Sequence, residues 1–235
     1  MTEPGKIKLL SFDLDDTLWP CKPTIMQAEQ TLYDWMQLRV PEITSRFDPQ
    51  ALRSHRINFL QQRLDLSHDM SALRIESLKA LAQEMKLETG WVNEAFEVFY
   101  QARQQITLYD DVTPVMDALK KQYRLIALTN GNASIDKTGV AHWFEFSLTA
   151  AEVGHQKPHP RFFAGVLERT GLDAGEILHI GDDPYRDISA AVEAGIRSVW
   201  LNRLGQPWPH SEYQAYREIE TLTALPEILN DLQAN

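Results

Sequence analysis

An apolar run near the start of the chain ends abruptly in acidic residues, and this pattern constrains the fold more than any other. Residues 7–12 have the composition of a short strand buried on both faces, and carboxylates follow it at Asp13 and Asp15. In an extended chain these two side chains project to the same side, where like charges are costly unless a cation or a shared proton relieves them. The run therefore indicates a chemical site at a strand end, while an acidic turn capped by Thr17 is the alternative explanation.

Two later strand-like runs also end in polar residues. Residues 124–128 lead into Thr129, and residues 176–180 lead into a glycine followed by Asp182. Between them lies Lys157, which we predict to be outside a helix because a proline follows it. Since ligands of open α/β sheets bind beyond the carboxyl ends of the strands, these side chains are expected to converge in one crevice.

These segments together resemble the four motifs of the haloacid dehalogenase-like hydrolase superfamily. The matching residues, in the superfamily's order, are Asp13-Leu14-Asp15-Asp16-Thr17, then Thr129, then Lys157, and finally Gly181-Asp182 with Asp187. The resemblance covers residues 1–20 and 110–205 well. It implies an α/β fold with a Rossmann-like, mostly parallel sheet core and an inserted α-helical cap.

The segment between the first two motifs has helical periodicity. Apolar residues recur at helical spacing over residues 25–36, 70–85 and 91–102, and Asp48 before a proline begins a further helix. The predicted domains are a Rossmann-like catalytic core and a helical cap, at residues 1–19 with 107–235 and at residues 20–106. Most aromatic residues of these stripes are expected to pack in the core of the cap. The candidate substrate contacts in the cap are Trp35, Trp91, Phe96, Phe99, Tyr100, Arg39, Arg63 and Arg74. A last strand is expected over residues 197–201 and a closing helix over residues 221–232.

The resemblance implies a magnesium-dependent phosphatase that works through an aspartyl-phosphate intermediate. Asp13 would attack phosphorus, and Asp15 would protonate the leaving alkoxide and later activate water. This role requires Asp15 to be protonated when substrate is bound, which neighbouring negative charge would favour. Mg²⁺ would be held by the carboxylates of Asp13 and Asp182 and by the backbone carbonyl of Asp15.

The transferring phosphoryl group needs donors and positive charge. By the same resemblance, Thr129, the backbone N–H groups near Asn130, and Lys157 would supply them. The predicted site is therefore catalytic at Asp13, Asp15, Thr129 and Lys157, substrate-binding at Thr129, Asn130 and Lys157, and metal-binding at Asp13, Asp15 and Asp182.

Several neighbouring polar residues have a structural interpretation instead. Asp183 before a proline has the pattern of a helix N-cap, and Gly195 is placed to close that helix. Asp187 is expected to orient the motif lysine or a metal-bound water. His155 and His159 would suit a zinc site only on a helix, which the prolines around them disfavour.

Composition predicts a soluble cytoplasmic enzyme. The chain has 235 residues, a net charge of −10 and a single cysteine, Cys21, which excludes an internal disulfide and fits a reducing compartment. No run approaches the length of a membrane span, and the start lacks the apolar segment of a signal peptide. The acidic balance disfavours nucleic acid as a partner. We expect a small phosphorylated metabolite as partner, no membrane association, and a monomer or homodimer.

The choice of substrate depends on the cap and is less constrained. Residues 128–133, 143–146 and 175–183 are similar to a bacterial subgroup of riboflavin biosynthesis that dephosphorylates flavin mononucleotide and 5-amino-6-(5-phosphoribitylamino)uracil. Sugar phosphates or nucleotides are alternative substrates, and a mutase or a non-enzymatic member of the fold are alternative functions. A haloacid dehalogenase would displace a halide, which needs neither a proton nor a metal, so Asp15 and the acidic fourth motif argue against it.

Overall fold

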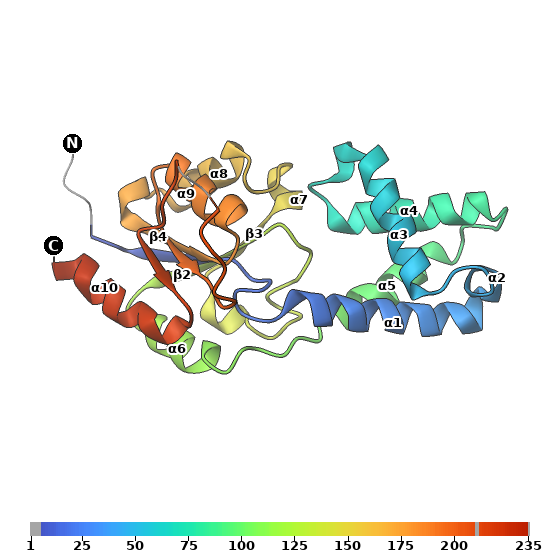
Figure 1. Cartoon of the computed structure of the whole chain (residues 1–235), viewed down its shortest axis with the longest axis horizontal. Helices are drawn as coiled ribbons and strands as arrows, with labels where there is room; N and C mark the ends of the chain where they lie inside the picture. The colour runs from blue at the N-terminus through green and yellow to red at the C-terminus, as the bar shows by residue number, and fades with distance from the viewer. Residues whose placement is uncertain (1–5, 210–211, 235) are drawn as a thin grey trace. The chain divides into compact units, whose positions relative to one another are not determined.

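The computed structural model describes residues 6–209 and 212–234. The chain divides into two compact units, one comprising Met1–Pro20 and Thr107–Asn235 and the other comprising Cys21–Ile106 (Figure 1). Among the helices of the described residues, none combines the length and the apolar character that crossing a bilayer requires.

The first unit is built on a parallel sheet. In the described part of the chain the sheet has six strands in the order β3-β2-β1-β4-β5-β6, and every neighbouring pair is parallel. The strands are β1 (Leu9–Phe12), β2 (Arg124–Thr129), β3 (Ser147–Thr149), β4 (Ile177–Gly181), β5 (Arg197–Leu201) and β6 (Arg217–Ile219). This confirms the predicted α/β fold class with a Rossmann-like sheet.

Helices cover both faces of this sheet, which explains why its central strands are continuously apolar. Figure 1 shows α8 and α9 on one face and α6 and α10 on the other. The bounds are α6 (Val112–Leu119), α7 (Ala150–Val153), α8 (Pro160–Thr170), α9 (Ala190–Glu193) and α10 (Leu225–Ala234). On the first face, Phe162, Phe163 and Val166 of α8 pack in one buried cluster with Leu9 and Ile126 of the strands.

Short turns account for the differences from the predicted element bounds. The strand predicted over residues 176–180 begins at Ile177, after a 3-10 turn over Ala174–Glu176. The closing helix is split, with a 3-10 turn over Leu222–Ala224 before α10. The edge strands β3 and β6 have three residues each, too few to give a recognisable strand pattern.

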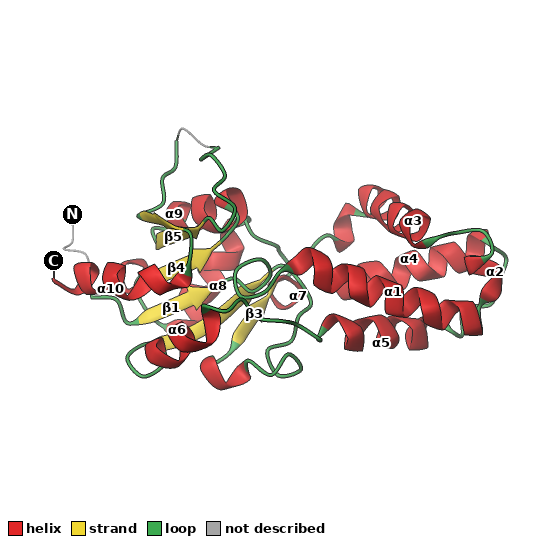
Figure 2. Cartoon of the chain, turned by 60° about the horizontal axis from the view of Figure 1, so that its bottom comes forward, coloured by secondary structure: helices red, strands yellow, loops and turns green. Residues whose placement is uncertain are grey.

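The second unit is all helical in its regular structure (Figure 2). Its helices are α1 (Cys21–Arg39), α2 (Pro41–Thr44), α3 (Pro49–Gln62), a 3-10 turn (Leu64–Leu66), α4 (Met70–Glu84) and α5 (Val92–Arg103). The stripe predicted on α1 is buried at Ala28, Leu32 and Met36, in a cluster with Phe99 of α5. Asp48 caps α3 as predicted, because its carboxylate accepts the Ala51 N–H at 2.7 Å.

Candidate active site

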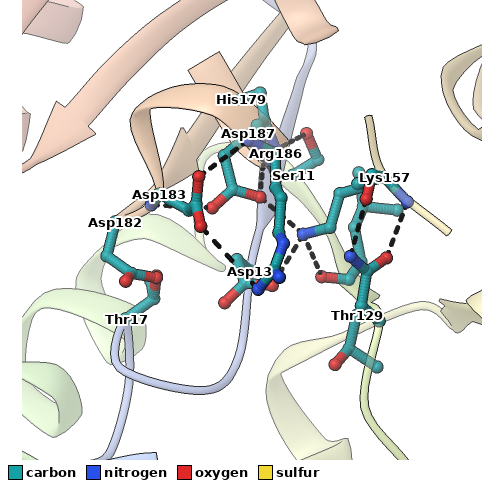
Figure 3. A network of polar contacts seen from close by, with 12 residues as sticks. Ser11, Asp13, Thr17, Thr129, Lys157, His179, Asp182, Asp183, Arg186 and Asp187 are labelled. Carbon is teal, nitrogen blue, oxygen red and sulfur yellow. Dashed lines mark hydrogen bonds and ion pairs between the residues drawn. The ribbon is translucent and has the colours of Figure 1, made fainter. Parts of the chain in front are cut away.

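The four motif segments meet at the carboxyl ends of three neighbouring strands. Asp13 follows β1, Thr129 ends β2, and Asp182 follows β4, while β1 lies between the other two in the sheet. Lys157 lies in a turn between α7 and α8, outside a helix as predicted. Figure 3 shows its side chain reaching towards Asp13. The convergence expected from the strand ends is therefore present.

Lys157 is the centre of a buried ionic network. Its Nζ lies 2.6 Å from Oδ1 of Asp13, 2.5 Å from Oδ1 of Asp187 and 3.2 Å from the carbonyl oxygen of Leu128. Burial by itself would lower the pKa of Lys157, but the two carboxylates raise it above its usual value. Conversely, the pKa of Asp187 would be raised by burial and is held well below its usual range by Lys157 and His179. The Lys157–Asp187 pair is therefore ionised.

The pKa values of Asp13 and Asp182 are raised, in contrast to that of Asp187. Burial raises the pKa of Asp13 well above its usual value despite the adjacent Lys157. Burial, with the nearby charges of Asp187 and Asp16, raises the pKa of Asp182 to about 8. Asp13 and Asp182 are thus two neighbouring buried carboxyl groups that resist ionisation. A bound cation would stabilise their ionised forms.

The donor atoms fit a hard divalent cation. One carboxylate oxygen from each of Asp13, Asp182 and Asp187 lies within 4.8 Å of the other two. Oxygen ligands of this kind suit Mg²⁺. Asp187 already uses both of its oxygens, Oδ1 on Lys157 and Oδ2 on the backbone N–H of Asp183. Asp13 and Asp182 are therefore the better placed ligands, and Asp187 holds the lysine.

The turn after β1 is braced by bonds from outside the motif. The Trp19 Nε1–H donates to Oδ1 of Asp15 at 2.8 Å, and the Thr17 hydroxyl donates to Oδ1 of Asp182 at 3.2 Å. The carbonyl oxygen of Thr17 accepts from Nη2 of Arg203 at 3.0 Å, and Arg203 also pairs with Asp111. These bonds hold the carboxyl groups of Asp15 and Asp182 in place.

Asn130 has a role that the sequence did not indicate. Its Nδ2 donates to the carbonyl oxygen of Lys157 at 2.9 Å, and its Oδ1 accepts the Lys157 N–H at 2.7 Å. The side chain thus clamps the backbone of the lysine. The hydroxyl oxygen of Thr129 accepts the Gly131 N–H at 2.9 Å, which leaves the hydroxyl proton to donate elsewhere.

Asp183, Gly195, His155 and His159 have the structural roles or positions that the sequence indicated. The Asp183 carboxylate caps the turn that follows, because it accepts the backbone N–H groups of Tyr185 and Arg186. Gly195, which follows α9, has φ +76°. That turn begins as a π-helical segment, Pro184–Ser189, instead of a regular α-helix. The ring of His159 accepts the Arg161 N–H and stacks on His155, and neither histidine lies in a helix.

The sequence patterns did not identify Ser11 and His179, which support Asp187 in the ionic network. Ser11 and His179, both fully buried on adjacent strands, form a 3.0 Å hydrogen bond between Oγ and Nδ1, and His179 Nε2 lies 3.3 Å from Oδ1 of Asp187. Burial lowers the pKa of His179 despite Asp187, so the ring is neutral. Because the ionised Asp187 only accepts, Nε2 carries the ring proton and Nδ1 accepts from Ser11. The signal was available, since each is a polar residue inside an apolar strand.

Comparisons with known proteins agree with this geometry. The family model for haloacid dehalogenase-like hydrolases matches residues 7–195. The 5-amino-6-(5-phospho-D-ribitylamino)uracil phosphatase YigB of Escherichia coli (strain K12) is 29% identical over 233 residues, which are 96% of this chain and 97% of that protein. The phosphoserine phosphatase of Thermus thermophilus is 34% identical over 116 residues, 47% of each chain.

A solved structure is similar over almost the whole chain. The crystal structure of a 2-haloacid dehalogenase from Pseudomonas syringae pv. Tomato DC3000 has a TM-score of 0.88 and 35% sequence identity, covering 96% of this chain and 99% of that one. The fold, the order of the four motifs and the family match lead to one conclusion. The chain belongs to the haloacid dehalogenase-like hydrolase family.

Proposed function

We propose that the protein is a magnesium-dependent phosphatase that hydrolyses a small phosphomonoester through an aspartyl-phosphate intermediate. The observation that carries the proposal is the carboxylate of Asp13 at the end of β1, held by the ammonium group of Lys157 at 2.6 Å. A carboxylate that attacks an anionic phosphate needs such fixed positive charge beside it. Asp15 stands two residues further on, as an acid for the leaving group.

The reaction would take place in two steps, the formation and the hydrolysis of the aspartyl-phosphate. A carboxylate oxygen of Asp13 forms a bond to phosphorus while the bond from phosphorus to the ester oxygen breaks, and Asp15 gives its proton to the departing alkoxide. Asp15 then takes a proton from water as the water oxygen bonds to phosphorus, and the Asp13–phosphorus bond breaks. Inorganic phosphate leaves, and both aspartates return to their first state.

Asp13, Asp182 and the backbone carbonyl of Asp15 would hold the magnesium ion. When bound, the ion would neutralise charge on the phosphate and on the two carboxylates. The pKa of about 8 at Asp182 supports this role, because a carboxyl group that is costly to ionise alone gains most from a cation.

Lys157 would act on the phosphoryl group through its charge and by placing Asp13. Its three N–H donors are already directed at Asp13, Asp187 and the Leu128 carbonyl. Thr129 would donate its hydroxyl proton to a phosphoryl oxygen. Asn130, predicted as a substrate-binding residue, would contribute by fixing the Lys157 backbone.

Flavin mononucleotide or 5-amino-6-(5-phosphoribitylamino)uracil is the proposed substrate. The support for the ribitylamino-uracil phosphate is the similarity to YigB over almost the full length of both chains. The support for flavin mononucleotide is the resemblance of residues 128–133, 143–146 and 175–183 to the bacterial subgroup. We further propose that Cys21–Ile106 forms the cap that selects the substrate, and that the enzyme serves riboflavin biosynthesis in the cytoplasm.

Dehalogenation is the second candidate, because a structure that is 35% identical is that of a 2-haloacid dehalogenase. The leaving halide needs no protonation, and the carbon centre carries no phosphate charge to neutralise. Asp15 and the high pKa of Asp182 would then serve no purpose. The phosphatase reaction uses both.

A substrate panel tests the proposal. Phosphate release is measured from flavin mononucleotide, the ribitylamino-uracil phosphate, nucleotides, sugar phosphates and glycerol phosphate, and halide release from 2-chloropropionate. We expect phosphate release only, with the highest kcat/KM for the two aromatic-headed phosphates. Higher efficiency on sugar phosphates would refute the substrate, and halide release without phosphate release would refute the phosphatase. An Asp13→Asn preparation controls for contaminating phosphatases.

A further inference from the structure

The helical unit contains a buried arginine whose ion pair is long. The Arg74 side chain on α4 is 9% exposed, and its closest acidic oxygen, Oε1 of Glu29, lies 3.6 Å from Nη2. At 3.6 Å this contact is longer than an ordinary hydrogen bond, so Glu29 is a weak partner for Arg74. The guanidinium lies over the ring of Phe99, 3.3 Å from the centroid, which offsets only part of the cost of burying a charge.

Two more arginines share the same glutamate. Nε of Arg53 and Nη2 of Arg56, both on α3, lie 2.7 Å from the two different oxygens of Glu29. Both carboxylate oxygens are therefore occupied. In the part of the chain that the structure describes, the buried Nε of Arg56 has no hydrogen-bond partner. Three guanidinium groups and one carboxylate leave a formal excess of two positive charges, in a chain whose net charge is −10.

The excess charge has an electrostatic consequence at Arg74. Burial, and then the neighbouring charge of Arg56, lowers the pKa of Arg74 to about 9 in spite of Glu29. The guanidinium remains charged at neutral pH but is poorly compensated. A second negative group next to it would stabilise the cluster.

A cavity lies against these residues. It has a volume of about 40 Å³, and Arg53, Arg56, Arg74 and Glu29 are among its lining residues, with Ser77 and His55. That volume accommodates roughly three water-sized groups. The oxygens of a phosphate group fit such a space, whereas the body of a metabolite does not.

We propose that this arginine pocket, formed by Glu29, Arg53, Arg56 and Arg74, binds a dianionic oxyanion of the phosphate class. Two negative charges match the excess of two positive charges, and the planar guanidinium groups suit paired bonds to phosphate oxygens. Glu29 stays on Arg53 and Arg56 and keeps them apart, while Arg74 donates to the anion. The pocket lies within the helical unit and does not depend on the proposed catalytic function.

Calorimetric titration of the full-length protein with inorganic phosphate tests the pocket, with chloride added to hold the ionic strength constant. We expect Arg74→Gln to weaken phosphate binding about tenfold or more. Arg56→Gln is a second variant, whose partly exposed position protects against a failure to fold. The matched control is Arg46→Gln, which removes the same charge from an exposed position of the same unit. The catalytic unit is identical in all four proteins, so phosphate bound there cancels in the comparison.

Each outcome decides the proposal. Loss of a phosphate-binding step in both pocket variants, with the step retained in Arg46→Gln, supports it. Equal affinity in all four proteins overturns it. A parallel titration with acetate distinguishes the class of ligand. If acetate binds as tightly as phosphate, and its binding is lost in the same variants, the pocket is a carboxylate site and the phosphate assignment is refuted.

Discussion

Gly181 and the side chain of Asp187 are packed so closely that a Cβ on Gly181 would lie 2.4 Å from Cγ of Asp187. Real Cβ atoms do not approach another carbon so closely, so a side chain at position 181 displaces Asp187. Asp187 holds Lys157, and Lys157 holds Asp13. Gly181, the glycine of the fourth motif, is therefore required by the packing that positions Asp13.

We predict that Gly181→Ala lowers kcat/KM by roughly a hundredfold, the loss typical of misplacing a reacting group by about 1 Å. Gly165→Ala is the control, because its Cβ would meet Leu148 at 3.7 Å, an ordinary contact. Gly165 lies within α8, so this change should stabilise the protein, by about 0.5–1 kcal/mol in urea unfolding. Full activity in Gly181→Ala would show that Asp187 does not position the lysine.

Asp13→Asn should abolish turnover while leaving the fold intact. The amide is nearly isosteric but cannot attack phosphorus, and Lys157 keeps Asp187 as its partner. Residual activity should fall to less than about a hundredth of wild type. The control is Asp16→Asn, since Asp16 has φ 60° and asparagine tolerates this left-handed conformation. Similar activity in the two variants would remove Asp13 as the nucleophile.

Asp15 should matter most for poor leaving groups. An alkoxide needs a proton as it departs, whereas an aryl oxide is stable without one. Asp15→Asn is therefore expected to slow hydrolysis of an alkyl phosphate far more than hydrolysis of p-nitrophenyl phosphate. The measurement is the ratio of kcat/KM on the two substrates, and an unchanged ratio contradicts the role as general acid.

Without magnesium, Asp182 should make stability depend on pH. An aspartate in the unfolded chain has a pKa of about 3.9, and the folded value is about 8, so the folded state binds the extra proton between these limits. The contribution of Asp182 to the free energy of unfolding therefore falls as pH rises through this range. We expect wild type in EDTA to lose stability relative to Asp182→Asn between pH 5 and pH 8. If the difference in unfolding free energy between wild type and Asp182→Asn does not change with pH, the raised pKa of Asp182 is refuted.

Magnesium should reverse this dependence. The cation binds the ionised carboxylate and competes with the proton, so magnesium affinity should rise with pH towards about 8. Chelation should abolish activity, added magnesium should restore it, and Asp182→Ala should remove the response. Activity that resists chelation would contradict the metal's role.

Ser11→Ala should lower kcat with little change in KM. The hydroxyl is expected to fix the proton of His179 on the nitrogen that faces Asp187, and a hydrogen bond of about 1 kcal/mol corresponds to roughly a fivefold effect. Ser198→Ala is the matched control, because Ser198 is the strand partner of His179 and its buried hydroxyl has no hydrogen-bond partner among the described residues. Ser11→Thr should retain the activity. Equal kcat values for Ser11→Ala and Ser198→Ala would show that the hydroxyl does not act through the histidine.

The sequence alone was sufficient for the fold class and for the prediction that the motif side chains converge at the strand ends. The strands at residues 9–12, 124–129 and 177–181 are apolar because both faces of a parallel sheet are buried, and polar residues at their ends are therefore conspicuous. The helical stripes and the caps at Asp48 and Asp183 follow from local periodicity and backbone chemistry in the same way.

Contacts across the fold were decided only by the tertiary structure. Asp13 and Lys157 are 144 positions apart, and nothing local to either residue specifies their 2.6 Å contact. The clamp from Asn130 to the Lys157 backbone, the crowding of Asp187 against Gly181 and the burial of Arg74 are of the same kind. The physical reason is that sequence periodicity gives the face on which a side chain lies, whereas strand register and helix packing set which atoms meet across that face.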